Sequence, residues 1–178
     1  MKVVISVHAH GLAFRLAEGL DRRGALEKIY TIYPRFKLTP YDISPSRLKS
    51  FWFLGGLKFL NIRLGDPFSN DGLSNLFDKL VTLDLRAPKD KKWIFHGFSG
   101  YSEAAMKKAK RLGAVAVIER GCPHIDAQQE FVAEEKSRLL EKKVFPENKP
   151  TYDRMKREYD LADYILVPSN YSRDSFIA

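Results

Sequence analysis

Glu119-Arg120-Gly121-Cys122-Pro123-His124 is the stretch whose side chains are best suited to chemistry. It places a carboxylate, a guanidinium and an imidazole within six residues, directly after a predicted strand. The planar guanidinium of arginine binds phosphate or carboxylate through two parallel hydrogen bonds, and histidine shares a proton near neutral pH. We therefore predict that Arg120 and His124 act on a bound substrate, with Glu119 beside them. The alternative is an Arg–Glu ion pair that only shapes the loop.

Two further turns offer glycine backbone and histidine at strand ends. Gly11 closes the turn His8-Ala9-His10-Gly11 and opens a predicted helix, where backbone N–H groups and the helix dipole favour a phosphate. His96 and Gly97 begin a second turn, which runs to Gly100 and also holds a candidate helix cap. We predict that Gly11, His96 and Gly97 contact the phosphates of a nucleotide. An ordinary polar turn is the alternative in both places.

The helix predicted after His124 carries polar residues on its apolar stripe. Ile125, Val132 and Leu139 mark the stripe at seven-residue spacing, and Gln128 and Glu135 fall on the same side. A polar group on a buried face is costly unless it is hydrogen-bonded. Gln128 and Glu135 are therefore bonded to the loops above the helix, or they face a site.

Alternating strands and helices must position these turns. Residues 3–7, 29–33, 93–96, 114–118 and 164–167 form short apolar runs typical of buried strands. Helical spacing lies between them, and Gly24 and Gly113 are predicted helix ends. Further helices are predicted at about 124–143 and 152–161, and Ser169 is a good N-cap for one more. This alternation predicts an α/β fold, with a mostly parallel, Rossmann-like sheet covered by helices on both faces. Ligands bind such sheets beyond the carboxyl ends of the strands, where the three turns lie.

Residues 34–79 give weaker signals. The segment 48–64 is rich in aromatic residues and carries two lysines. It is interpreted equally well as a helix buried against the sheet and as an amphipathic helix on a membrane surface. Residues 65–72 predict a loop, and residues 81–85 predict a strand.

Composition limits the class of protein. A chain of 178 residues predicts one domain, and 44% hydrophobic with 29% charged residues indicates a folded globular protein. The formal charge of +8 permits an anionic partner without identifying it. The single cysteine rules out an internal disulfide and fits a reducing cytoplasm, and no apolar run approaches the ~20 residues of a membrane span. The basic stretch 136–157 matches no recognised nucleic-acid-binding motif, so we predict no nucleic-acid partner.

Four stretches resemble family 4 glycosyltransferases of the GT-B fold. They are Glu119-Arg120-Gly121-x-x-His124-Ile125-x-x-Gln128, then Glu134-Glu135, then Glu158-Tyr159-x-Leu161-Ala162-Asp163-Tyr164-Ile165-Leu166-Val167-Pro168-Ser169, and Arg173-Asp174-Ser175-Phe176-Ile177. The clear similarity covers about residues 93–178. It is closest to the bacterial and archaeal subgroup with an R-G-x-x-H-I-x-x-Q stretch.

The resemblance implies a retaining glycosyltransferase that uses a nucleotide-sugar donor, without a bound metal or other cofactor. Such enzymes have two Rossmann-like domains facing a cleft, and residues 1–178 would be the N-terminal, acceptor-side domain without its C-terminal donor domain. Arg120 and His124 would lie near the transferred sugar or the acceptor, with Gln128 and Glu135 supporting them. The acceptor would be a sugar or a lipid-linked sugar, the latter with peripheral membrane contact. The alternative is a stand-alone Rossmann-like module that binds a phosphorylated ligand or a protein.

Overall fold

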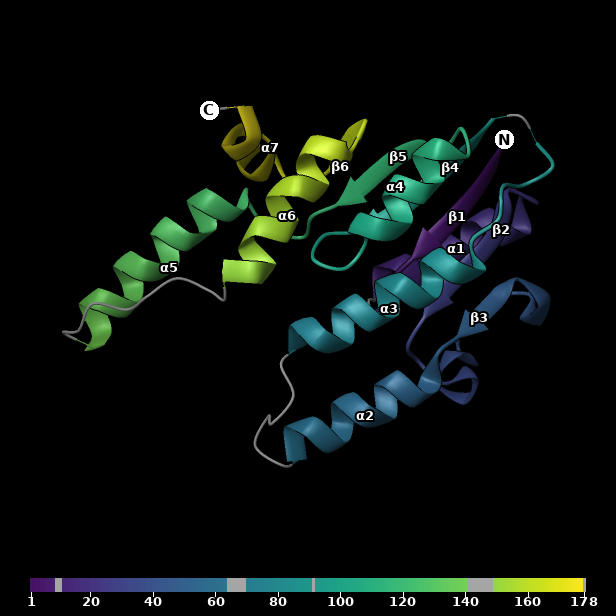
Figure 1. Cartoon of the computed structure of the whole chain (residues 1–178), viewed down its shortest axis with the longest axis horizontal. Helices are drawn as coiled ribbons and strands as arrows, with labels where there is room; N and C mark the ends of the chain where they lie inside the picture. The colour runs from purple at the N-terminus through teal and green to yellow at the C-terminus, as the bar shows by residue number, and fades with distance from the viewer. Residues whose placement is uncertain (9–10, 64–69, 91, 141–148, 178) are drawn as a thin grey trace.

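The computed structural model describes the chain apart from residues 9–10, 64–69, 91, 141–148 and 178. Within this part of the chain, six parallel strands form one sheet (Figure 1). The strands are β1 (Lys2–Ser6), β2 (Leu26–Thr31), β3 (Leu48–Ser50), β4 (Trp93–Phe98), β5 (Val115–Glu119) and β6 (Tyr164–Leu166). The helices are α1 (Gly11–Arg22), α2 (Trp52–Arg63), α3 (Asn70–Asp84), α4 (Glu103–Arg111), α5 (Ile125–Leu140), α6 (Lys149–Leu161) and α7 (Asn170–Ile177), with the short 3-10 helices η1 (Arg35–Leu38) and η2 (Pro45–Arg47). The predicted α/β class and parallel sheet are confirmed.

The order of strands across the sheet is β3-β2-β1-β4-β5-β6. The chain builds outward from β1 to β3 and then crosses back, so that β4 pairs with the free side of β1. This is the Rossmann-like order, and the direction of winding reverses between β1 and β4. The carboxyl ends of β1 and β4 therefore flank the crevice where such sheets bind ligands.

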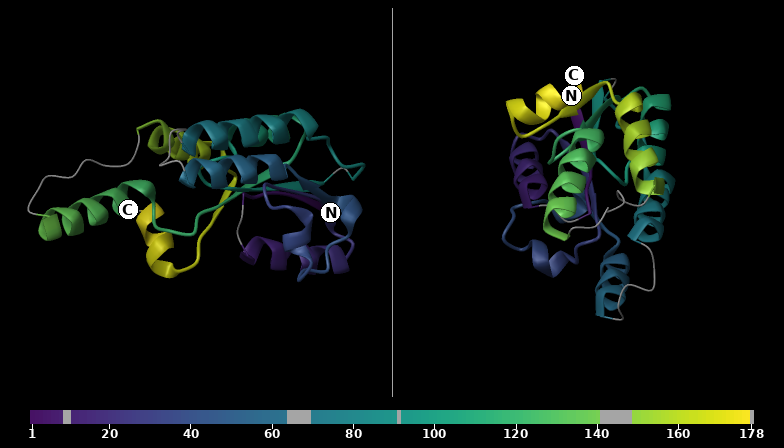
Figure 2. Two further views of the ribbon diagram at one scale, coloured as in Figure 1. Left: turned by 90° about the horizontal axis from the view of Figure 1, so that it is seen from below. Right: turned by 90° about the vertical axis from the view of Figure 1, so that its left-hand side faces the viewer.

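Helices cover the two faces of the sheet unequally (Figure 2). α1 lies on one face, where Phe14 packs on Ile5 and Ile29 in a core shared with η1. The larger core lies on the other face, under α2, α3, α4 and α6, and includes Phe77, Phe95 and other buried side chains. The strands supply both cores because successive side chains of a strand point to opposite faces.

The α1 face is left open beyond β4. Val115 on β5 and Tyr164 and Leu166 on β6 point to this face by the strand register, and all three side chains are exposed. On α1 itself, Leu12 and Leu16 are exposed at four-residue spacing. An apolar surface thus remains on this side of the sheet.

The segment predicted as a strand at residues 81–85 is helical, so that prediction was wrong. Residues 81–84 end α3 and Leu85 follows directly, and Phe77, Val81 and Leu85 are fully buried at four-residue spacing. A short apolar run fits either a strand or one turn of a helix, and here packing against α4 decides for the helix. The loop prediction for residues 65–72 also fails at residues 70–72, which begin α3, whereas residues 65–69 lie outside the described residues.

Several predicted boundaries are confirmed. Gly24 and Gly113 lie two residues beyond the last residues of α1 and α4, with φ angles of 65° and 84° that favour glycine. Ser169 caps α7, because its Oγ accepts a hydrogen bond from the backbone N–H of Ser172 at 3.1 Å. The helix predicted at 124–143 is α5, and residues 141–143 lie outside the described residues.

Candidate functional site at the carboxyl edge of the sheet

His8 lies at the point where the sheet reverses its winding. It follows β1, and its carbonyl accepts hydrogen bonds from the backbone N–H of Ile32 (3.2 Å) and from Thr31 Oγ1 (2.6 Å). Its ring stacks on Tyr101 at 3.8 Å with an interplanar angle of 4°, and meets the edge of Phe77 at 4.6 Å. Bonds at the backbone and aromatic contacts at the ring thus hold the imidazole in one orientation.

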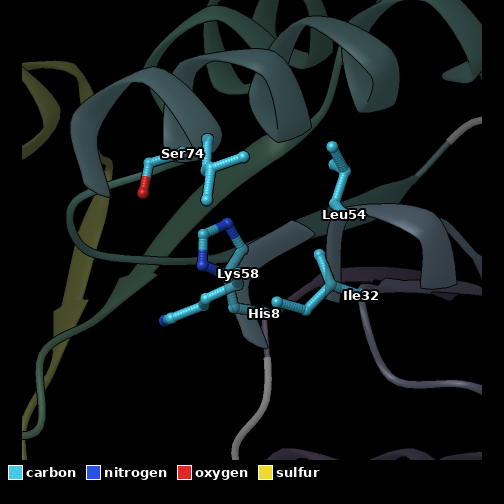
Figure 3. A pocket seen from close by; sticks show the side chains of 6 residues that line it. His8, Ile32, Leu54, Lys58 and Ser74 are labelled. Atoms are coloured by element: carbon cyan, nitrogen blue, oxygen red, sulfur yellow. The ribbon is translucent and has the colours of Figure 1, made fainter. Parts of the chain in front are cut away.

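A small cavity of about 10 Å³ lies against this imidazole (Figure 3). Four segments meet there: the residues that follow β1 and β2, helix α2, and the first turns of α3. The lining residues are His8, Ile32, Leu54, Lys58, Leu73 and Ser74. A cavity of this size holds about one water molecule, so it fits one oxygen atom of a ligand rather than a whole sugar.

The imidazole of His8 stays neutral at physiological pH. Burial lowers its pKa to about 3, and the positive charges of Lys58 and Arg154 lower it in the same direction. Its Nε2 atom is buried and has no hydrogen-bond partner among the described residues. A neutral ring nitrogen beside the Lys58 ammonium and the Ser74 hydroxyl can bind a hydroxyl group or a phosphoryl oxygen.

The loop between β4 and α4 holds Tyr101 over His8. Glu158 of α6 is fully buried, and its two carboxylate oxygens accept hydrogen bonds from the backbone N–H groups of Gly100 (2.5 Å) and Ser102 (2.7 Å). Asp78 of α3 accepts two more at the start of α4, from Ala104 and Ala105. Burial raises the pKa of Glu158 to about 7 and that of Asp78 to about 6. These two carboxylates position the loop without reaching the cavity.

Arg120 follows β5 as predicted, but its guanidinium is directed into the protein. The side chain is buried and donates hydrogen bonds to the Gln128 side-chain oxygen and, at 3.3 Å, to the carbonyl of Pro123. Gln128 is thus satisfied by Arg120, which accounts for a polar residue on the inner side of α5. Arg120 and Gln128 together hold the loop after β5.

His124 joins the same cluster from the start of α5. Its ring lies against Tyr159 of α6 (5.2 Å) and Phe176 of α7 (4.9 Å), and its backbone N–H donates to Ser175 Oγ at 2.8 Å. Burial lowers the pKa of the imidazole, and this outweighs the opposite effect of Asp126. The structure therefore brings Arg120, Gln128 and His124 together, next to α7.

His96 and Gly97 lie inside β4, so their predicted place in a turn was wrong. The strand continues to Phe98 because His96 pairs with Val117 and Gly97 with Ile118 on β5. His96 Nε2 lies 3.0 Å from the Glu119 carboxylate, on the α1 face of the sheet. Glu119 therefore partners His96 rather than Arg120, and the ion pair between Arg120 and Glu119 that was the alternative interpretation is not present.

Gly97 is required by packing. A Cβ atom at this position would come within 2.7 Å of the Cβ and Oγ atoms of Ser102, which is fully buried. The glycine lets α4 approach the sheet closely. Its predicted contact with a nucleotide is untested.

Gly11 and Glu135 are the two remaining residues predicted for the site, and the structure places only Gly11 at the carboxyl edge of the sheet. α1 begins at Gly11, as the turn predicts, with its amino end at the carboxyl edge of the sheet. Glu135 forms an ion pair with Arg138 of its own helix at 2.9 Å, on the exposed part of α5. Glu135 is therefore not brought to the Arg120 cluster.

Lys58, Ser74 and Tyr101 were missed by the sequence reasoning. Each lies outside the predicted strand-end turns: Lys58 within α2, Ser74 within α3, and Tyr101 directly after Gly100, the last residue of the predicted turn. Their place around His8 depends on helix packing, and no local motif marks it. Among the described residues, no group of three His, Cys, Asp or Glu side chains could hold a metal ion, and no helix is long and apolar enough to span a bilayer.

The similarity of this chain to a known protein is a similarity of fold. No family model matches the chain, and no curated protein matches it. A crystal structure with the same fold is that of a Listeria monocytogenes protein assigned as a UDP-N-acetylglucosamine 2-epimerase. The TM-score is 0.57 at 11% sequence identity, over 99% of this chain and 41% of that chain. This chain has a Rossmann-like, GT-B-like fold. It spans about two fifths of the length of that protein.

Proposed function

We propose that this chain is the acceptor-side half of a two-domain enzyme that acts on nucleotide-linked sugars, and that its reaction is glycosyl transfer with retention. The observation that carries the proposal is the structural match, which covers 99% of this chain but 41% of a protein named for its action on UDP-N-acetylglucosamine. A second domain would supply most of the donor site. The donor is a nucleotide sugar, and no further cofactor is invoked.

The chemistry at the carboxyl edge is compatible with this reaction. Glycosyl transfer develops negative charge on the departing phosphate, which cations and helix amino ends stabilise. Lys58 and the start of α1 at Gly11 are the groups that would do so here. The neutral imidazole of His8 would bind a hydroxyl of the acceptor or of the transferred sugar.

The cluster after β5 has a different part in the proposal. Because the guanidinium of Arg120 is occupied by Gln128 and Pro123, we assign it to shaping the loop. His124 is the residue of this cluster that we propose to lie near the transferred sugar. Gln128 supports Arg120, whereas Glu135 is left out of the site.

The open part of the α1 face favours a two-domain enzyme over a stand-alone binding module. A stand-alone module would be expected to cover the apolar side chains that β5 and β6 expose there. Leu12 and Leu16 on α1, which lies on the same side of the sheet, are exposed as well. We propose that the second half of the enzyme packs on or next to it.

Two measurements test the proposal. The first is the intact mass of the native polypeptide in its source cells, expected at roughly twice 20.4 kDa for two domains of similar size. The second is turnover of nucleotide sugars by that native protein, with and without sugar and lipid-linked acceptors. Transfer should require an acceptor, and Lys58→Met should reduce it at least tenfold, whereas Lys79→Met, at an exposed lysine of α3, should leave it unchanged.

Three results would contradict the proposal. A native mass of 20.4 kDa would leave the chain as a binding module. Robust turnover by the 178-residue chain alone would show that no second domain is needed. Conversion of the sugar nucleotide without any acceptor would replace transfer by an isomerisation such as epimerisation.

A further inference from the structure

The outward face of α2 is almost wholly apolar. Trp52 is 63% exposed, Phe59 59% and Leu60 54%, and Phe53 and Leu57 are also exposed. Between residues 52 and 60 the sole outward position without a large apolar side chain is Gly56. An apolar surface of this extent on a folded protein marks an interaction site.

The opposite face of α2 attaches the helix to the body of the protein. Leu54 is buried in the larger core, and Gly55 lies directly over the carbonyl oxygen of Ile32. Lys58 lines the His8 cavity. One face of α2 therefore already packs against the protein. The exposed aromatic side chains lie on its other face and are not part of that packing.

Phe36 of η1 extends the apolar surface. It is 71% exposed and lines a groove of about 610 Å³ together with Trp52. Pro34, Arg35 and Ser50 complete the groove. In Figure 1 α2 lies at the outer edge of the molecule beyond α3, and in the right-hand view of Figure 2 it lies at the lower edge.

Positive charge surrounds this surface. Residues 33–60 contain five basic residues and one acidic residue, Asp42. Arg47 and Lys49 are paired with Asp21 and Asp84 of other elements. Arg35 and Lys37 flank Phe36 in the sequence, whereas Lys58 lies on the inward side of α2 at the His8 cavity.

We propose that the exposed face of α2, together with Phe36, docks onto a bilayer that contains anionic lipids. Tryptophan and phenylalanine insert at the level of the lipid headgroups, and nearby lysine and arginine side chains bind the anionic headgroups. Protein interfaces are instead depleted in lysine. Exposed aromatic residues beside Arg35 and Lys37, which form no ion pair among the described residues, therefore fit a lipid surface better than a protein partner.

Bilayer binding through α2 has a consequence for the candidate site. Lys58 and Leu54 line the His8 cavity from the other side of the same helix. Docking would hold this cavity close to the headgroups. The docking itself does not depend on the proposed glycosyl transfer and is tested without it.

The two tryptophans make the test direct. Trp93 is 2% exposed within the core and Trp52 is 63% exposed on α2, so a change in tryptophan emission on binding reports Trp52. The purified chain is titrated with vesicles of phosphatidylcholine alone, or of equal parts of phosphatidylcholine and phosphatidylglycerol. We expect a blue shift of the emission and co-sedimentation with the mixed vesicles, weakened by added salt.

Matched variants identify the surface. Trp52→Ser combined with Leu57→Ser should lower the affinity for mixed vesicles at least about tenfold, because two inserting side chains are lost. Phe131→Ser combined with Tyr171→Ser removes side chains of 60% and 69% exposure on α5 and α7, and should leave binding unchanged. Circular dichroism of both double variants verifies that they are folded.

Three outcomes would overturn the proposal. The first is an unchanged emission spectrum with no co-sedimentation. The second is equal binding to both kinds of vesicle, which would remove the role of anionic lipid. The third is a dimer in sedimentation equilibrium that the Trp52 and Leu57 changes dissolve, because the surface would then belong to a second copy of the chain.

Discussion

Gly55 and Gly56 are neighbours in α2, yet alanine should have opposite effects on stability at the two positions. At Gly55 a Cβ atom would stand 2.7 Å from the backbone oxygen of Ile32, whereas at Gly56 it would meet no atom within 4 Å. Ile32 follows β2, and its carbonyl belongs to the sheet rather than to a flexible side chain. Relief of the contact therefore requires α2 to move away from the sheet.

The magnitudes follow from two opposing effects. Replacing glycine by alanine inside a helix stabilises it by about 0.5–1 kcal/mol, and this applies at both positions. Overpacking costs about 1–3 kcal/mol, and this applies at Gly55 alone. Gly56→Ala should thus raise the free energy of unfolding by about 0.5–1 kcal/mol. Gly55→Ala should be less stable than Gly56→Ala by about 1–3 kcal/mol.

Urea denaturation followed by circular dichroism measures both variants against the wild-type chain. Each variant is the control for the other, because both replace a glycine of α2 by alanine. Equal stabilisation by the two alanines would refute the close approach of α2 to Ile32. It would also remove the packing that brings Lys58 and Leu54 to the His8 cavity.

Three further predictions concern the core, the cavity and α7. Gly97→Ala should destabilise the protein by about 1–3 kcal/mol because of the contact with Ser102, and Gly121→Ala, which has open space, should not; urea denaturation distinguishes them. The folded state lowers the pKa of His8 to about 3, so the stability that this residue contributes is complete above about pH 6.5 and is lost as the pH falls towards 3. Between pH 7 and pH 5 the free energy of unfolding of the wild-type chain should thus fall by about 2 kcal/mol more than that of His8→Phe. Urea denaturation at the two pH values measures this, and an equal fall in both proteins would contradict a buried, neutral imidazole. Ser169→Ala should speed amide hydrogen exchange in α7 about fivefold, because the helix loses its cap. The control Ser137→Ala, at an exposed serine of α5, should leave exchange in α7 unchanged.

The sequence alone was sufficient to predict the strands and helices whose hydrophobic residues repeat at a clear spacing. Strands β1, β5 and β6 lie within a residue or two of their predicted positions, because runs of apolar and β-branched residues favour strands locally. Helix ends at Gly24, Gly113 and Ser169 were also predictable, since each depends on the conformation or hydrogen bonding of one residue. The prediction failed at residues 81–85, because a run of five residues is too short to distinguish the hydrophobic repeat of a strand from that of a helix.

The candidate site was predictable only in part. His8 was singled out as part of a strand-end turn, and Arg120, Gln128 and His124 do lie together as their spacing suggested. The partners of these residues were not predictable. Glu119 lies one residue from Arg120 in the chain, but it points to the opposite side and binds His96.

Local sequence therefore determined which segments are strands and helices, and where several of them end. Tertiary structure decided the order of the strands, the orientation of Arg120, and the meeting of Lys58 and Ser74 at His8. The physical reason is the range of the interactions. Turn conformation, capping and hydrophobic period act within a few residues, whereas the environment of a side chain at the sheet edge depends on helices that pack there from 50 or more residues away.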